Sequence, residues 1–128
     1  MSALLDALAS RGNDACGALE RFLGDEALYE TCFRQFLADP AFPALEAALD
    51  SGDGAAAFEA AHTIKGVAGN LGLTELYRAA CALAEPLRHG GSTAGLEPRR
   101  QALGRAKAAL DALADYKRAA FAALFFCR

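Results

Sequence analysis

The chain lacks several features that mark whole classes of protein. It has no tryptophan, few valines or isoleucines and only four prolines, in a composition dominated by Ala and Leu. Such a composition favours helices over sheets. With 128 residues, the chain is long enough for one hydrophobic core and too short for a second substantial one. We therefore expect a single all-α domain over residues 1–128.

Charge and hydropathy exclude two further classes. The chain has no cluster of Lys and Arg with interleaved aromatic residues, and its net charge is −3, so no nucleic-acid partner is expected. No stretch approaches the roughly 18 uninterrupted apolar residues of a membrane span, and no basic flank precedes an apolar segment at the N-terminus. We predict a cytoplasmic protein with no membrane partner.

The cysteines show no pattern typical of zinc binding or redox chemistry. Cys16, Cys32, Cys81 and Cys127 are widely scattered, and no C-x-x-C pair occurs. Two disulfides are the less favoured alternative, because no secretory signal accompanies the cysteines. We expect reduced thiols that pack within apolar helical patterns, except at Cys127.

Glycine, proline and aspartate divide the chain into short helical blocks. Apolar spacing predicts helices around residues 4–8, between 14 and 24, from 25 to about 38, over 40–50, from 54 to about 71, from 74 to the loop at 89, and from about 98 onward. Asp25, Asp53 and Thr74 are the expected N-caps. Pro86 is expected to kink or shorten its helix.

Four of these helices each carry one apolar stripe and are joined by short loops. They are the helices at 25–38, 54–71 and 74–88 and the long one from about 98. This pattern predicts an antiparallel up-and-down four-helix bundle, with the additional short N-terminal helices capping one end. The stripe residues expected on the second, third and last helices are Ala15, Leu19, Phe22 and Leu23; Leu28, Cys32, Phe33 and Phe36; and Leu103, Ala106, Leu110, Leu113, Ala120 and Leu124.

The helix expected at 54–71 has two faces, and its histidine lies on the polar one. Small apolar residues gather on one side, and His62 falls roughly 150° from the centre of that side. Phe58, Lys65, Gly66 and Gly69 share the side of the histidine. His62 is therefore predicted to face solvent, where a neutral imidazole is a nucleophile that needs no activating triad.

Two glycines and a lysine surround this histidine. A glycine costs about 1 kcal/mol relative to alanine inside a helix, so Gly66 and Gly69 are expected to leave room for the catalytic groups of a second protein. The ammonium of Lys65 lies one turn away, within reach of a phosphoryl group on the ring. Glu59 is a weaker candidate to orient the ring through a hydrogen bond to its other nitrogen.

The segment AHTIKGVAGNLG over residues 61–72 closely resembles the signature of the histidine phosphotransfer (HPt) family, H-x-[LI]-K-G followed by small residues and Leu-Gly. The resemblance covers roughly residues 14–90. It implies that His62 accepts a phosphoryl group from a receiver-domain aspartate and passes it to another receiver, with Lys65 and Gly66 at motif positions of the family. It also implies a carrier without kinase activity or a cofactor of its own, since magnesium is expected on the receiver.

The same resemblance implies response-regulator receiver domains and a hybrid sensor kinase as partners. Gly69, Phe58, Asn70 and Arg88 are candidate docking residues, although a place against the neighbouring helix is the favoured interpretation for Phe58. We expect a monomer and, from Met1 and the absence of a ragged linker, a free-standing protein. The chain departs from a frequent family pattern at Ala84, where many members carry Glu.

Three other functions stay open. An adaptor that has lost phosphotransfer would bind receivers only. A di-metal bundle needs two Glu-x-x-His pairs, and Glu59 with His62 forms one. A kinase dimerisation helix usually has an acidic residue after its histidine, where this chain has Thr63, and the chain has no nucleotide-binding segment. Phosphotransfer is the favoured function, and no metal site is expected.

Overall fold

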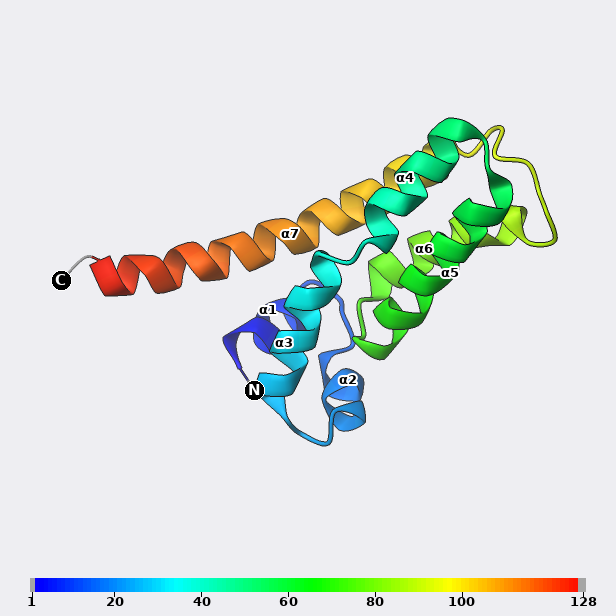
Figure 1. Ribbon diagram of the computed structural model, residues 1–128. Helices are drawn as coiled ribbons and strands as arrows, with labels where there is room; N and C mark the ends of the chain where they lie inside the picture. Colours follow the sequence, from blue (N-terminus) through cyan, green and yellow to red (C-terminus); the bar gives the residue numbers. More distant parts are fainter. Residues whose placement is uncertain (1, 127–128) are drawn as a thin grey trace.

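A computed structural model describes the backbone of residues 2–126 and the side chains of residues 2–115. This described part of the chain contains seven helices and no strand, as the composition predicted (Figure 1). The helices are α1 (Ala3–Ser10), α2 (Ala15–Arg21), α3 (Glu26–Leu37), α4 (Ala41–Ser51), α5 (Gly54–Asn70), α6 (Thr74–Leu87) and α7 (Glu97–Phe126).

The bundle is formed by α4, α5, α6 and α7. Each of these helices packs along the next one, while α1, α2 and α3 gather at one end (Figure 1). An antiparallel four-helix bundle was predicted, but α3 was wrongly expected to be one of its four helices. In the structure α4 packs along α5 in that place, and α3 contacts α7 instead. α3 and α4 are separate helices because Pro40, which lies between them, lacks the N–H that a continuous helix would use there.

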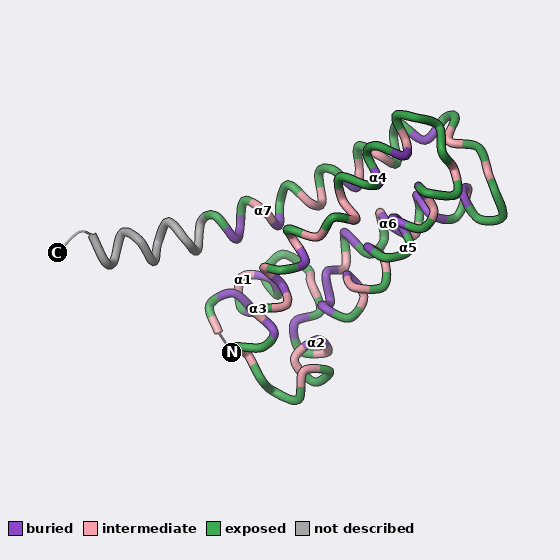
Figure 2. The backbone as a smooth tube through the Cα atoms, viewed as in Figure 1, coloured by how far each residue is buried: buried purple, intermediate pink, exposed green. Residues whose placement is uncertain are grey.

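One face of α5 is buried between α4 and α6. Its members are mostly small, as predicted: Ala57, Ala60, Ala61, Ile64 and Ala68. Alanine side chains allow neighbouring helices to approach closely, and the buried residues form one core that runs through the bundle (Figure 2). Because these contacts set the rotation of α5 about its own axis, they also decide which residues of α5 face solvent.

Aspartate side chains begin three of the helices. Asp14, Asp25 and Asp53 each accept a hydrogen bond from the backbone N–H three residues later, at 2.9–3.1 Å. The predicted caps at Asp25 and Asp53 are therefore confirmed. Gly52 precedes the last of them in the left-handed conformation, with φ of 75°, as expected of the turn before α5.

The predicted N-cap of α6 was wrong. Leu73 occupies the cap position and makes no side-chain cap hydrogen bond. The Oδ1 atom of Asn13 accepts the hydrogen bond from the N–H of Thr74 at 3.0 Å. A side chain from the start of the chain therefore caps α6, which local sequence could not reveal.

The N-terminal segment also holds the turn between α5 and α6. The carbonyls of residues 69–72 accept hydrogen bonds from the backbone N–H of Asp14, the guanidinium of Arg21 and the hydroxyl of Tyr29, at 2.6–3.0 Å. Carbonyls at the end of a helix lack partners within the helix. At Gly72, where φ is +69°, an added Cβ would lie 2.3 Å from the carbonyl oxygen of Asp14, so this close approach requires glycine.

Pro86 shortens α6 only slightly. The helix continues one residue further, to Leu87. Proline cannot donate a hydrogen bond to the carbonyl of Ala82 one turn earlier. The Nη1 atom of Arg99 on α7 donates to that carbonyl at 2.7 Å. The carbonyl that Pro86 leaves without a helical partner therefore binds α7.

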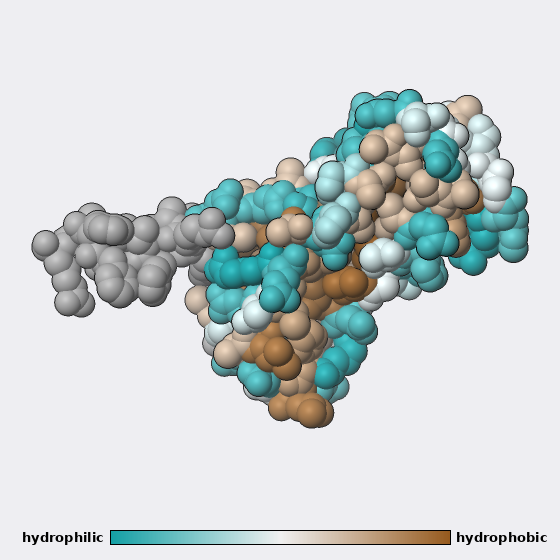
Figure 3. All heavy atoms as spheres, viewed as in Figure 1, coloured by the Kyte–Doolittle hydropathy of each residue, from teal (hydrophilic) through white to brown (hydrophobic). Residues whose placement is uncertain are grey.

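Some residues expected in the core lie at the surface. Leu23 is 94% exposed and has φ of 55°, because α2 ends before it, and Leu28 is 48% exposed. Hydrophobic residues accordingly reach the surface near α2 and α3 (Figure 3). Cys16 is exposed, whereas Cys32 and Cys81 are half-buried, and all three are free thiols. Cys127 and the side chains of Ala120 and Leu124 lie outside the described residues.

We expect Tyr29→Phe to lower the free energy of unfolding by about 1–3 kcal/mol at neutral pH, because the buried carbonyl of Leu71 loses its donor. Burial raises the pKa of the Tyr29 hydroxyl above its ordinary value of 10.0, although the charge of Arg21 acts in the opposite direction. The raised pKa favours the neutral hydroxyl in the folded state. The contribution of Tyr29 is therefore complete below pH 10.0 and is lost as the pH rises through the raised pKa.

Urea unfolding of both proteins at neutral pH and above pH 10.0 checks this expectation. The stability difference between them should shrink at the higher pH. Tyr77→Phe is the control at neutral pH, since Tyr77 is 39% exposed and its hydroxyl does not hold the turn. A difference that stays constant with pH would contradict the role given to burial of Tyr29.

Candidate functional site

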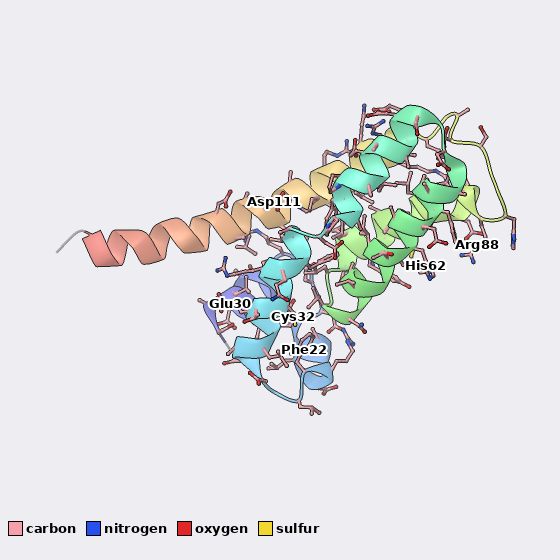
Figure 4. All side chains as sticks on the ribbon, in the orientation of Figure 1. Phe22, Glu30, Cys32, His62, Arg88 and Asp111 are labelled. Carbon is pink, nitrogen blue, oxygen red and sulfur yellow. The ribbon has the colours of Figure 1, made fainter. Side chains whose placement is uncertain are left out.

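His62 projects from the exposed side of α5, as predicted (Figure 4). Its ring stacks on Phe58, one helical turn earlier, with 5.6 Å between ring centroids and 20° between ring planes. Helical side chains lean toward the N-terminus, which brings residues four apart together. Stacked aromatic rings at such a separation contribute about 0.5–1.5 kcal/mol. The imidazole is therefore exposed to solvent and packed against one aromatic ring.

Arg88 completes a row of three side chains that joins α6 to α5. Its guanidinium carbon lies 5.8 Å from the centroid of the Phe58 ring, and its Nη2 atom lies 3.4 Å from Oε2 of Glu85. A cation over an aromatic face contributes about 0.5–1 kcal/mol at an exposed site. Arg88 is the C-cap residue of α6 and lies on the same side of the molecule as His62 (Figure 4). Pro86, two residues before Arg88, therefore does not prevent Arg88 from lying beside Phe58.

The structure does not support the expected role of Glu59. Within residues 2–115, the ring of His62 has no hydrogen-bond partner, and Glu59 contributes its carbonyl oxygen to the hydroxyl of Thr63 at 3.0 Å. The ring of His62 stacks on Phe58 instead. Lys65, one turn beyond His62, is half-buried, and its ammonium has no ion-pair or hydrogen-bond partner in the same part of the chain.

The two glycines near His62 have different surroundings. A Cβ added to Gly66 would meet nothing within 4 Å, so the backbone there is open to solvent, as predicted. A Cβ added to Gly69 would lie 3.4 Å from two carbons of the Tyr77 ring. Gly69 therefore lies beside a side chain of α6, at an ordinary van der Waals distance from an added Cβ, and its role toward a partner stays a prediction.

Tyr77 and Arg21 are site neighbours that sequence reasoning missed. The Tyr77 ring covers Gly69, and a hydrogen bond with the Cys81 thiol raises the pKa of its hydroxyl. Arg21 donates to the carbonyl of Asn70, which is exposed at the end of α5. The glycine at position 69 was the one sequence signal for Tyr77, and it was assigned to partner access instead. Arg21 had none, because its partners are backbone atoms 48 and 49 residues away.

Metal-ligating residues do not cluster in the described part of the chain. No group of three or more His, Cys, Asp or Glu side chains there has the arrangement of a metal site. Both residues of the Glu59–His62 pair are exposed, whereas the ligands of a di-metal bundle project into the core. Among the described residues, no helix is long and apolar enough to cross a membrane.

A model of the Hpt domain family matches residues 33–116. The chain belongs to the Hpt family. The match takes in α4, α5 and α6 and includes His62, Lys65 and Gly66. It extends past the region of the sequence resemblance into α7. Searches of curated proteins and of solved structures each gave no significant match.

Membership of the Hpt family defines the broad class of activity. Hpt domains carry phosphoryl groups in phosphorelays, their partners are receiver domains, and they are not kinases. Ala84, which departs from a frequent family pattern, is buried on the core side of α6. The departure therefore lies among the packed residues of this Hpt domain.

We expect Gly66→Ala to raise the free energy of unfolding by about 0.5–1 kcal/mol, because the new Cβ meets no neighbour and alanine favours the helix. Gly69→Ala should gain a similar amount, since its Cβ would meet the Tyr77 ring at 3.4 Å, an ordinary van der Waals distance. Urea unfolding of the two variants beside the native protein provides the comparison. A loss at position 69 would contradict the ordinary contact with Tyr77, and a loss at position 66 would contradict its open surroundings.

Proposed function

We propose that this Hpt domain accepts a phosphoryl group on His62 from a receiver-domain aspartate and passes it to a second receiver. The whole chain acts as one monomeric carrier domain between response-regulator receivers and a hybrid sensor kinase. The observation that carries the proposal is the exposed imidazole of His62, within the family match, beside an open glycine and a lysine that has no ion-pair partner among residues 2–115. The chain contributes the nucleophile and a surface, and the receiver contributes its acidic pocket and magnesium.

The two proteins together supply every group that the transfer needs. A lone pair on one nitrogen of the His62 ring attacks the phosphorus of the aspartyl phosphate. The N–P bond forms, the bond from phosphorus to the carboxylate oxygen breaks, and its electron pair returns to the aspartate. In the second transfer, an aspartate oxygen of the next receiver attacks the same phosphorus and the electron pair of the N–P bond returns to the imidazole.

Lys65 and Gly66 serve this reaction in different ways. The ammonium of Lys65 is one turn from the ring and has no competing partner among residues 2–115, so it is free to attract the phosphoryl oxygens. Gly66 leaves the backbone bare where the receiver must approach. Neither residue changes the nucleophile, and both act on the incoming charged group.

A direct transfer assay tests the proposal. Receiver domains are loaded from radiolabelled acetyl phosphate and mixed with this protein, and the label on the protein is tested for its stability. Phosphohistidine should appear as label that survives alkali and is lost in acid. His62→Gln should abolish it, whereas His89→Gln, which changes the other histidine of the chain, should retain it.

The outcomes separate the proposed carrier from its alternatives. Label that persists in His62→Gln contradicts the assignment of the phosphoacceptor. Receivers that bind the native protein without transferring label would identify an adaptor. Loss of label in His89→Gln alone would move the site to the loop that follows α6.

We expect Gly66→Leu to slow transfer by about tenfold to a hundredfold while the helix content stays nearly unchanged, because the leucine obstructs the receiver beside the ring. Gly104→Leu is the matched control. Gly104 is also an exposed helical glycine with nothing within 4 Å of an added Cβ, and it lies on α7. Transfer at the native rate by Gly66→Leu, measured in single turnover, would contradict the clearance role of Gly66.

A further inference from the structure

A histidine exposed on a helix has freedom that phosphotransfer does not tolerate. In a helix, two χ1 wells and two broad χ2 ranges are open to an imidazole that touches nothing. In-line attack on phosphorus requires one ring nitrogen to point at the receiver within a narrow range of directions. Something must therefore select one orientation of the His62 ring before the receiver arrives.

The described structure offers one group that can make this selection. Within residues 2–115, the His62 ring has no hydrogen-bond partner, and its ring contact is with Phe58. The two rings are near parallel, at 20°, with centroids 5.6 Å apart. Such a contact uses neither ring nitrogen in a hydrogen bond, so both nitrogens are available to solvent and to a receiver.

Phe58 is itself held from the neighbouring helix. Its ring is half-buried, and the guanidinium of Arg88 lies 5.8 Å from its centroid. Glu85, one turn before Arg88 on α6, pairs with the guanidinium at 3.4 Å. Arg88 is thus linked to the imidazole through the Phe58 ring, and no hydrogen bond or ring contact joins Arg88 directly to His62 in the described structure.

We propose that Phe58 is a positioning residue for phosphotransfer, which holds the His62 ring in its reactive orientation and is kept in place by Arg88. This inference rests on the proposed function of His62 and adds two residues to it. Phe58 has no part in the bond changes. It acts by raising the fraction of molecules whose imidazole already points in the reactive direction.

The size of the effect follows from the number of orientations that become open. If Phe58 is replaced by a side chain without a ring face, the imidazole distributes over two χ1 wells and two χ2 ranges. The reactive fraction then falls to about one quarter, so the rate constant at saturating receiver falls by at most about fourfold. The receiver concentration at half saturation should change less than about twofold, because docking is not the step affected.

The principal test compares Phe58→Leu, Phe58→Tyr and the native protein in single-turnover transfer from a receiver loaded with acetyl phosphate. Leucine keeps apolar bulk and removes the ring face, whereas tyrosine keeps the ring. We expect the leucine variant to lose about twofold to fourfold in the saturating rate constant and the tyrosine variant to restore it. A native rate constant in Phe58→Leu overturns the proposal. A change confined to the half-saturating concentration also overturns it and makes Phe58 a docking contact.

Phe42→Leu provides a matched control for lost packing. Phe42 is also a half-buried aromatic residue with a cation over its ring, the Nζ atom of Lys107 at 4.7 Å, but it lies on α4 and packs on Phe36. Its replacement should cost stability without changing the transfer rate constant. If Phe42→Leu slows transfer as much as Phe58→Leu, the effect belongs to bundle stability and the proposal fails.

A second measurement does not depend on transfer. Three-bond NMR couplings across χ1 of His62 should show a single rotamer in the native protein and averaged values in Phe58→Leu, with partial averaging in Arg88→Gln. Native values in Phe58→Leu contradict the proposal, and native values in Arg88→Gln remove Arg88 from it. If the native protein accepts no label, the proposed function has failed, and these couplings still decide whether Phe58 orients the ring.

Discussion

The burial of one face of α5 is the constraint on which the candidate site depends. Small side chains on this face pack between α4 and α6, and that packing fixes the rotation of the helix. His62 lies opposite the buried face because of its position in the sequence, so it faces solvent whenever the core is formed. The hydrogen bonds of Asp14, Arg21 and Tyr29 fix the far end of the same helix. A stiff scaffold thereby presents one reactive side chain.

The site has little chemical machinery of its own, which suits a carrier. The described chain places no general base on His62, and the nearest ring is that of Phe58. A carrier that activated its own nucleophile or stabilised its own phosphoryl group strongly would be slower to release that group to the next receiver. Orientation and access are the properties that such a protein can supply without this cost.

Helical periodicity predicted what depends on neighbouring residues along the chain. It gave the two faces of α5, the outward direction of His62, the turn at Gly52 and the caps at Asp25 and Asp53. It also placed Phe33 and Phe36 of α3 correctly in the core, but it chose Leu28, which is exposed, and missed Tyr29, which is buried. A tyrosine satisfied by a backbone carbonyl 42 residues away is indistinguishable in sequence from one that faces water.

Contacts between distant segments could not be predicted from the sequence. Asn13 caps a helix that begins 61 residues later, and the Tyr77 ring lies 3.4 Å from the position of a Cβ on Gly69. Phe58 was ambiguous for the same reason. Its neighbour on the other helix, Arg88, lies 30 positions away, and periodicity carries no information about which residues of α5 and α6 meet.

The central claim is that phosphorylation occurs on an imidazole that the core already directs outward. NMR of the protein during transfer from a phosphorylated receiver tests it most directly, because the chain has two histidines and a single isoleucine, Ile64, buried two residues after His62. The ring signals of His62 should shift, while those of His89 and the methyl signals of Ile64 stay in place. A shift at His89, or movement of the Ile64 methyl groups that revealed repacking of α5, would contradict the account.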